Sequence, residues 1–198
     1  DHDRSHLPAL DVLEQQCAEQ AQILADAGCD MLALEMLFDI DTSVAMLKGT
    51  QQVGLPVSIG LVCRQDDDGQ VTLRLPRNLP MPGEKTIDLS ESLPRILDAA
   101  RHPDNLIVSV MHTELEDIAP ALEVVQRYWD GLTCAYPNNG HHAEPERWDT
   151  STGYSEFEFS NACLEWVGLG VNMVGGCCGV GPTHIQVLGQ SLMQIPNA

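Results

Sequence analysis

The chain has 198 residues, of which 10 are Lys or Arg and 29 are Asp or Glu, so its formal net charge is −19. This charge argues against nucleic acid and anionic membrane surfaces as partners, because both are bound through clustered basic side chains that the sequence lacks. Hydrophobic residues make up 43%, which is enough for a globular core and too many for a disordered chain.

Helical and strand patterns alternate along the sequence. Apolar residues at helical spacing, helix caps and short buried apolar runs define the elements. In chain order we expect helix 11–27, strand 30–36, helix 41–51, strand 56–63, a polar loop from 64 to 69, a small hairpin at 71–75, helix 90–100, strand 106–110, helix 115–128, strand 132–136, a loop to 153, helix 155–168, strand 171–174 and helix 182–193.

The five main strands are continuous apolar runs separated by helices, which predicts an α/β fold with a parallel sheet covered by helices. We treat residues 1–198 as one domain. The chemically unusual residues follow the carboxyl ends of these strands, where parallel sheets and barrels bind ligands. They are Glu35, Cys63, His112, the segment 136–140 (YPNNG) and the pair Cys177-Cys178. The sequence therefore predicts one functional rim.

The location of the protein follows from its cysteines and its apolar segments. Seven cysteines are an odd number, scattered through apolar segments, unlike the framework of a disulfide-rich secreted domain. The apolar stretches are shorter than the ~20 residues that cross a bilayer, and no export signal is recognisable. We therefore expect a cytoplasmic protein that does not enter membranes.

Cys177 and Cys178 are adjacent and lie between glycines in GGCCG. Two thiolates at a strand end suit Zn²⁺, and a catalytic zinc has three protein ligands and one open position. His112, which follows another strand, is the candidate for the third ligand. Other interpretations stay open. The two cysteines could instead form a redox pair or simply occupy a tight turn, and His112 could instead be a surface or capping residue.

Two segments resemble the homocysteine S-methyltransferase family. They are 135–140 (AYPNNG) and 174–185 (VGGCCGVGPTHI), which are similar to the family's YPN-x-G and GGCCG motifs in order and separation. Residues 28–35 (GCDMLALE) resemble the family's strand AGxDxxxxET, and residues 112–122 resemble the segment of its first zinc cysteine. The resemblance thus extends along the whole chain.

This resemblance implies a (β/α)8 barrel of the TIM type that binds zinc and presents the thiol of homocysteine as a ligand. Cys177 and Cys178 would be zinc ligands, Glu35 would bind the substrate's α-ammonium group, and Asn138 would lie near the site. The implied partners are a small-molecule thiol and a methyl donor, and the implied cofactor is Zn²⁺.

In this resemblance, the first zinc cysteine of the family corresponds to His112 of this chain. Imidazole is neutral where thiolate is charged, so a His/Cys/Cys site with Zn²⁺ has a net charge of zero instead of −1. Such a site holds a substrate thiolate more tightly and makes it a weaker nucleophile. It could also activate water for hydrolysis.

A complete barrel of this type needs about 250 residues, and only five strand-helix units are recognisable here. The N-terminal units of the family have no counterpart, so the barrel is incomplete and two sheet edges stay open. Either the chain is a fragment, which we favour, or a partner such as a second copy covers the edges.

The sequence thus predicts a zinc-dependent methyltransferase that moves a methyl group from a sulfonium or quaternary ammonium donor to homocysteine or a related thiol. Two alternatives remain. The barrel is inactive and binds zinc as a structural or interaction module, or it is a zinc-dependent hydrolase.

Overall fold

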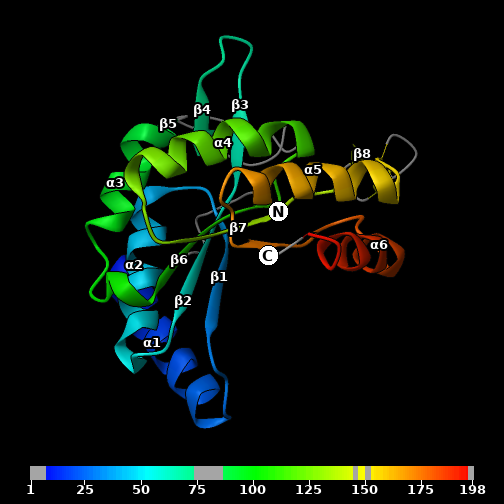
Figure 1. The fold of residues 1–198 in the computed structure, drawn as a ribbon. Coiled ribbons are helices and arrows are strands. Elements are labelled where there is room, and N and C mark those ends of the chain that lie inside the picture. Colours follow the sequence, from blue (N-terminus) through cyan, green and yellow to red (C-terminus); the bar gives the residue numbers. More distant parts are fainter. Residues whose placement is uncertain (1–7, 74–86, 145–146, 150–152, 196–198) are drawn as a thin grey trace.

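A computed structural model describes residues 8–73, 87–144, 147–149 and 153–195. Within these residues, six α-helices alternate with the strands of one main sheet, and two small antiparallel sheets of three and two strands accompany it (Figure 1). The helices are α1 (Leu10–Asp26), α2 (Ile40–Thr50), α3 (Leu89–Leu97), α4 (Leu115–Tyr128), α5 (Glu156–Gly168) and α6 (Pro182–Leu192). The main strands are β1 (Leu32–Leu37), β2 (Val57–Leu61), β6 (Leu106–Met111), β7 (Leu132–Tyr136) and β10 (Met173–Val174).

The main sheet is parallel throughout, and its strand order is β1-β2-β6-β7-β10. Each strand lies beside the one that precedes it in the sequence, with helices on the outside of the curved sheet (Figure 1). A doubly wound sheet would instead reverse its strand order at a switch point. The consecutive order is that of a barrel wall, which confirms the expected α/β fold as an incomplete TIM-type barrel.

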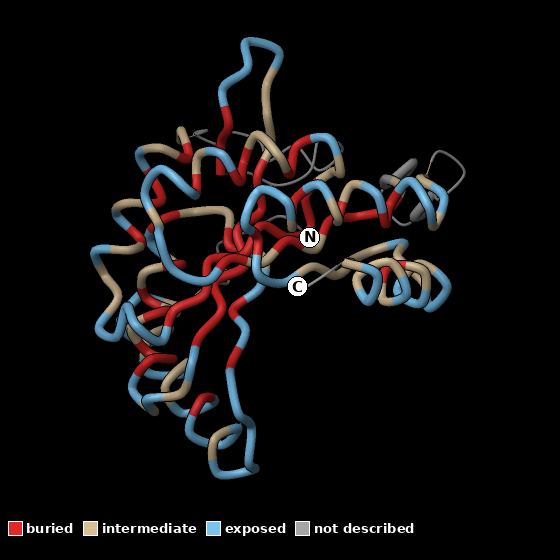
Figure 2. The backbone as a smooth tube through the Cα atoms, viewed as in Figure 1, coloured by how far each residue is buried: buried red, intermediate tan, exposed pale blue. Residues whose placement is uncertain are grey.

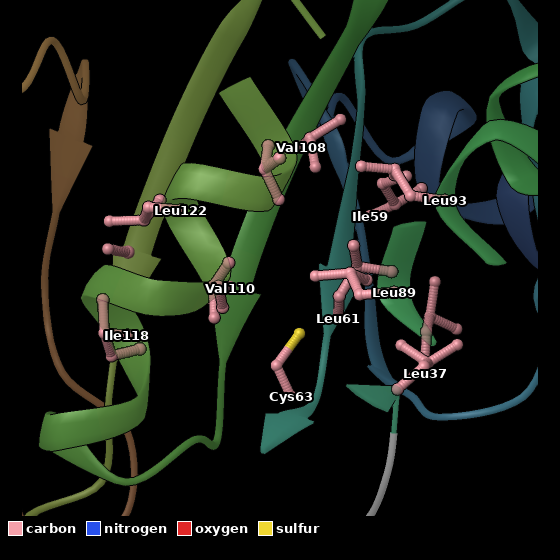
Figure 3. Close-up of a cluster of buried hydrophobic side chains, with 14 of the residues drawn as sticks. Leu37, Ile59, Leu61, Cys63, Leu89, Leu93, Val108, Val110, Ile118 and Leu122 are labelled. Carbon is pink, nitrogen blue, oxygen red and sulfur yellow. The ribbon is translucent and has the colours of Figure 1, made fainter. Parts of the chain in front are cut away.

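The hydrophobic core lies between the sheet and the helices. Figure 2 shows the buried residues concentrated along the strands and on the helix faces beside them. Alternate strand residues point to this side. They pack with Leu93 of α3 and with Ile118 and Leu122 of α4, and include Ile59, Leu61, Val108 and Val110 (Figure 3). The core residues of the outer layer therefore hold the strand ends, and with them the rim, in place.

The opposite, inward face of the sheet carries smaller and more polar side chains. The hydroxyl groups of Ser58 and Ser109 are 2.7 Å apart across β2 and β6. Ala33 and Glu35 on the edge strand β1 are exposed. This is the face that would line the interior of a closed barrel.

Local sequence features fix several helix positions. The hydroxyl of Ser155 accepts a hydrogen bond from the Glu158 amide at 3.3 Å, and the Glu158 carboxylate accepts one from the Ser155 amide, which is a capping box for α5. Helices α1 and α2 pack closely at Gly49, where a Cβ atom would lie 2.2 Å from the Glu14 carbonyl oxygen. Only glycine permits this approach.

Two segments expected as loops contain short strands. Residues expected as part of a polar loop belong to β3 (Cys63–Gln65), which pairs antiparallel with β4 (Val71–Leu73); β4 also pairs with β5 (Ile87–Asp88). A tight turn forms because the Asp66 carboxylate accepts hydrogen bonds from the amides of Asp68 and Gln70. The long loop after β7 contains β8 (His141–Glu144) and β9 (Arg147–Asp149). The expected hairpin at 71–75 is present in part: β4 lies there, its partner β3 comes from the segment expected as a loop, and residues 74–75 lie outside the described residues. Polar composition hid β3 and the β8–β9 hairpin.

No helix in the described part of the chain combines the length and the apolar character needed to cross a bilayer.

Candidate metal and substrate site

Three predicted ligands come together at the carboxyl end of the sheet. The Nδ1 atom of His112 lies 3.5 Å from the Sγ atom of Cys177 and 3.5 Å from that of Cys178, and the two sulfur atoms are 3.9 Å apart. The ligand atoms of His112, Cys177 and Cys178 all lie within 4.8 Å of one another, close enough to share one metal ion. Residues that follow β6 and β10, two strands apart, thus form one cluster.

The spacing of these atoms suits a tetrahedral ion. Zn–S bonds of ~2.3 Å and Zn–N bonds of ~2.1 Å place two sulfur ligands about 3.8 Å apart, and a sulfur and a nitrogen about 3.6 Å apart. The three observed separations lie within about 0.1 Å of these values. The residues therefore fit zinc, with one corner of the tetrahedron left for another ligand.

The loop after β7 holds the two cysteines in place. The Cys177 amide donates to the Pro137 carbonyl oxygen at 2.8 Å, and the Cys178 carbonyl oxygen accepts from the Asn139 amide at 2.7 Å. The YPNNG and GGCCG segments therefore lie side by side, joined by main-chain hydrogen bonds. Their proximity follows from β7 and β10 being neighbours in the sheet.

His112 is held by the residue that follows it. The hydroxyl of Thr113 accepts from the Cys63 amide at 2.9 Å and donates to the Met111 carbonyl oxygen at 2.8 Å, while the Thr113 carbonyl oxygen accepts from the Asn138 amide at 2.9 Å. His112 itself is buried and has a φ of 46°. A non-glycine residue in this left-handed region is strained by about 1–2 kcal/mol, and the contacts of Thr113 stabilise the turn.

The environment of the Cys177 thiol opposes its ionisation in the absence of a cation. Burial raises the pKa of the Cys177 thiol to about 11, and the charges of Cys178 and Glu35 act in the same direction. A divalent cation would reverse this balance, because a coordinating thiol gives up its proton. Cys177 is thus poorly suited to be a reactive free thiolate at neutral pH and better suited to bind a metal.

Glu35 lies on the same face as the cluster. Its carboxylate is close enough to the Tyr136 hydroxyl and to Cys177 to raise the pKa of both groups. Burial, followed by the Glu35 charge, raises the pKa of Tyr136. The ring of Tyr136 passes over Gly60, where a Cβ atom would lie 2.9 Å from the tyrosine hydroxyl. Tyr136 therefore extends from β7 across the sheet to Glu35 on β1.

Asn138 is almost fully buried beside the same rim. It is 3% exposed, and its Oδ1 atom has no hydrogen-bond partner among the described residues. A buried acceptor without a partner costs about 1–3 kcal/mol, so such an atom is a candidate for contact with a ligand or water.

Sequence reasoning did not identify every contact of the site. The sequence places Tyr136 at the rim but indicates no contact for it, and it indicates no role for Thr113, His184 or the side chain of Asn139. No spacing or composition pattern marks these contacts, because they join loops from different strands. Cys63, which was expected at the rim, lies in the hydrophobic core.

The comparisons with known proteins agree with the motifs. The homocysteine S-methyltransferase family profile matches residues 4–192. The chain belongs to this family. It is 33% identical over 189 residues to homocysteine S-methyltransferase 2 of Arabidopsis thaliana, covering 93% of this chain and 51% of the relative. It is also 37% identical over 60 residues to a selenocysteine Se-methyltransferase of Brassica oleracea var. italica, covering 29% of this chain and 17% of that protein.

Solved structures support the fold. The apo form of the homocysteine methyltransferase MmuM from Escherichia coli superposes with a TM-score of 0.65 at 17% identity, covering 95% of this chain and 60% of that one. The metallated form of MmuM gives a TM-score of 0.64 at 15% identity, covering 94% and 54%. The chain spans about half the length of the curated family members that it matches over most of its own length.

Proposed function

We propose that the protein is part of a zinc-dependent S-methyltransferase that transfers a methyl group from a sulfonium or quaternary ammonium donor to homocysteine or a related thiol. The observation that carries this proposal is the cluster of His112, Cys177 and Cys178, with tetrahedral spacing, in a member of the homocysteine S-methyltransferase family. The MmuM homologue has been crystallised in a metallated form.

In this proposal His112, Cys177 and Cys178 hold the zinc ion. When bound, Zn²⁺ lowers the pKa of a coordinating substrate thiol and so supplies a thiolate nucleophile at neutral pH. One imidazole and two thiolates leave the site less negative than three thiolates would. A substrate thiolate is then held more firmly, so we expect slower methyl transfer than at a three-cysteine site.

Glu35 and Asn138 are the proposed substrate contacts. The exposed Glu35 carboxylate can accept hydrogen bonds from an α-ammonium group, and the neighbouring Tyr136 hydroxyl is in a position to orient it. The free Oδ1 atom of Asn138 offers a second acceptor close to the cysteine loop. Two acceptors and no basic side chain in this set suit the ammonium end of an amino acid.

The chain need not supply a proton to the leaving group. A sulfonium or quaternary ammonium donor leaves as a neutral molecule once its methyl group has moved, so no general acid is required. The net charge of −19 also attracts cationic donors.

The proposal is tested by metal analysis combined with a thiol-methylation assay. We expect about one zinc per chain and methylation of homocysteine by at least one sulfonium or quaternary ammonium donor, with both lost in Cys178→Ser. The matched control is Cys29→Ser, since Cys29 is an exposed cysteine outside the cluster. Zinc without methylation by any donor would favour a structural zinc module or a hydrolase, and absence of zinc would refute the metal site.

Two wider proposals concern the whole protein. Strands β1 and β10 are the edges of the main sheet, and we propose that a second copy or further strands cover them, which sedimentation analysis would test. All seven cysteines are free, in keeping with our proposal of a cytoplasmic location.

A further inference from the structure

His184 lies six residues after the cysteine pair, in the first turn of α6, and contacts three separate segments. Its Nδ1 atom accepts a hydrogen bond from the Gly181 amide at 3.2 Å. Its Nε2 atom lies 3.2 Å from the Tyr154 carbonyl oxygen and 2.9 Å from the Nδ2 atom of Asn139. The ring also packs edge-to-face on the buried Phe159 of α5, with centroids 5.6 Å apart. Helices α5 and α6 run side by side (Figure 1).

These contacts fix the orientation of the ring. Nδ1 accepts from the Gly181 amide, and Nε2 faces both the Tyr154 carbonyl oxygen and the side-chain amide of Asn139. The ring therefore acts as a fixed bridge between the end of the cysteine loop and the segment before α5.

Asn139 connects the same segment to Cys178. Its side-chain amide forms two hydrogen bonds with the main chain of Tyr154: Oδ1 accepts from the amide at 2.6 Å, and Nδ2 donates to the carbonyl oxygen at 3.0 Å. Its own main-chain amide donates to the Cys178 carbonyl oxygen at 2.7 Å. Tyr154 thus contacts both His184 and Asn139.

Both ends of the segment 178–181 are consequently anchored to Tyr154. Asn139 anchors Cys178, and His184 anchors Gly181. Between them lies Gly179, whose φ of 77° is a left-handed turn that brings no rigidity of its own. The hydrogen bonds of Asn139 and His184 therefore limit the movement of the segment that begins at the second cysteine of the pair, Cys178.

We propose that His184 is a positioning residue that, with Asn139, pre-organises Cys177 and Cys178 for metal binding. This inference rests on the proposed metal site. His184 does not touch the ion in this assignment; it holds the backbone that carries the ligands. Residues that orient metal ligands in this way typically change metal affinity by about 10–100-fold.

The test compares His184→Ala with two other variants in a Co²⁺ titration of the whole protein, followed by the visible absorption of thiolate-bound cobalt. We expect His184→Ala to weaken Co²⁺ binding about 10–100-fold. His184→Gln should restore much of it, because a glutamine at the third helical position can accept the Gly181 amide in the same way. The matched control is Ser155→Ala, which removes the cap of α5 and should lower stability while leaving Co²⁺ affinity within twofold of the original.

A merely structural role would give a different result. If His184→Ala and Ser155→Ala lose similar stability and bind Co²⁺ as tightly as the unmodified protein, the inference is overturned. Equal weakening by Ala and Gln would also overturn it, since the hydrogen bond to Gly181 would then be irrelevant.

A second measurement separates this inference from the proposed function. Hydrogen exchange of the Asn139 amide in the metal-free protein reports its bond to the Cys178 carbonyl oxygen. We expect at least tenfold faster exchange in His184→Ala than in the unmodified protein or in Ser155→Ala. If the unmodified protein binds no Co²⁺ but exchange is faster in His184→Ala, the positioning role of His184 is supported and the metal site is refuted. Unchanged exchange in His184→Ala would refute the positioning role.

Discussion

Gly60→Ala should damage both the stability and the substrate site of the protein. A Cβ atom at this position would lie 2.8 Å from the Met111 Cγ atom, 2.9 Å from the Tyr136 hydroxyl and 3.1 Å from the Leu34 carbonyl oxygen. All three contacts are shorter than van der Waals separation, so the side chains of Met111 and Tyr136 would have to shift, while the Leu34 carbonyl is fixed in the backbone. A shift of the tyrosine would move its hydroxyl relative to Glu35.

The magnitude follows from two opposing effects. Overpacking by one methyl group costs about 1–3 kcal/mol, and replacing glycine in a strand recovers about 0.5–1 kcal/mol of backbone entropy. We expect a net loss of about 1–2 kcal/mol, seen as a melting temperature lower by about 2–8 °C for a chain of this size. If the proposed function holds, KM for homocysteine should also rise, while KM for a thiol without an amino group should change little.

Gly189→Ala is the matched control, because nothing lies within 4 Å of a Cβ atom at that position in α6. This substitution should stabilise the protein by up to about 1 kcal/mol and leave both KM values unchanged. Thermal unfolding and steady-state assays of both variants decide the matter. If Gly60→Ala is as stable as Gly189→Ala, the description of the inward face is wrong; if it is destabilised but binds homocysteine normally, Tyr136 does not orient Glu35 for substrate.

Three further predictions address the metal ligands, the orphan acceptor and the buried thiols. His112→Ala should weaken zinc binding about 100-fold or more, since a site worth about 10–16 kcal/mol loses one of its ligands. His112→Cys should bind zinc at least as tightly as the unmodified protein. Competition with a chromogenic chelator measures both affinities, and an unchanged affinity in His112→Ala would remove His112 from the site. Urea unfolding should show a smaller loss of unfolding free energy for Asn138→Leu than for Asn139→Leu. The reason is that the Asn138 Oδ1 atom has no hydrogen-bond partner among the described residues, whereas the Asn139 side-chain amide makes two hydrogen bonds to Tyr154. The reverse order would show that Asn138 is a structural residue. Burial raises the pKa of the Cys163 thiol to about 12, so its contribution to the free energy of unfolding is complete at neutral pH. This contribution declines as the pH rises above the unfolded pKa of ~8.5, by about 2 kcal/mol at pH 10. In urea unfolding, Cys163→Ala should lose correspondingly less free energy of unfolding at alkaline pH, and an equal loss in both proteins would contradict this.

The sequence predicted most of the main sheet and its helices because their patterns are local. Helix α4 and strand β7 have the expected bounds, and the other main elements differ at their ends by a few residues. Buried strands are continuous apolar runs, and helices show caps and apolar spacing, so both are visible without knowledge of the fold. The β3–β4 hairpin was harder to predict, since its first strand is polar and is stabilised by a turn whose hydrogen bonds come from Asp66.

The candidate ligands were also predictable, but their supporting contacts were not. Cys177 and Cys178 are conspicuous as an adjacent pair, and parallel strands bring their carboxyl ends to one rim, so His112 could be placed near them by topology alone. The bonds of Thr113, Asn139 and His184 join residues that are distant in sequence and ordinary in type. Their roles depend on loop geometry that no composition or spacing pattern records.

The central claim is that one imidazole and two adjacent thiolates share a zinc ion. X-ray absorption at the zinc edge of the loaded protein tests it most directly, because the bond lengths distinguish sulfur from nitrogen or oxygen. We predict two sulfur ligands at about 2.3 Å and at least one nitrogen at about 2.0–2.1 Å, with the imidazole contribution absent from the spectrum of His112→Ala. A first shell of oxygen and nitrogen alone, or the same imidazole contribution in His112→Ala, would contradict the account.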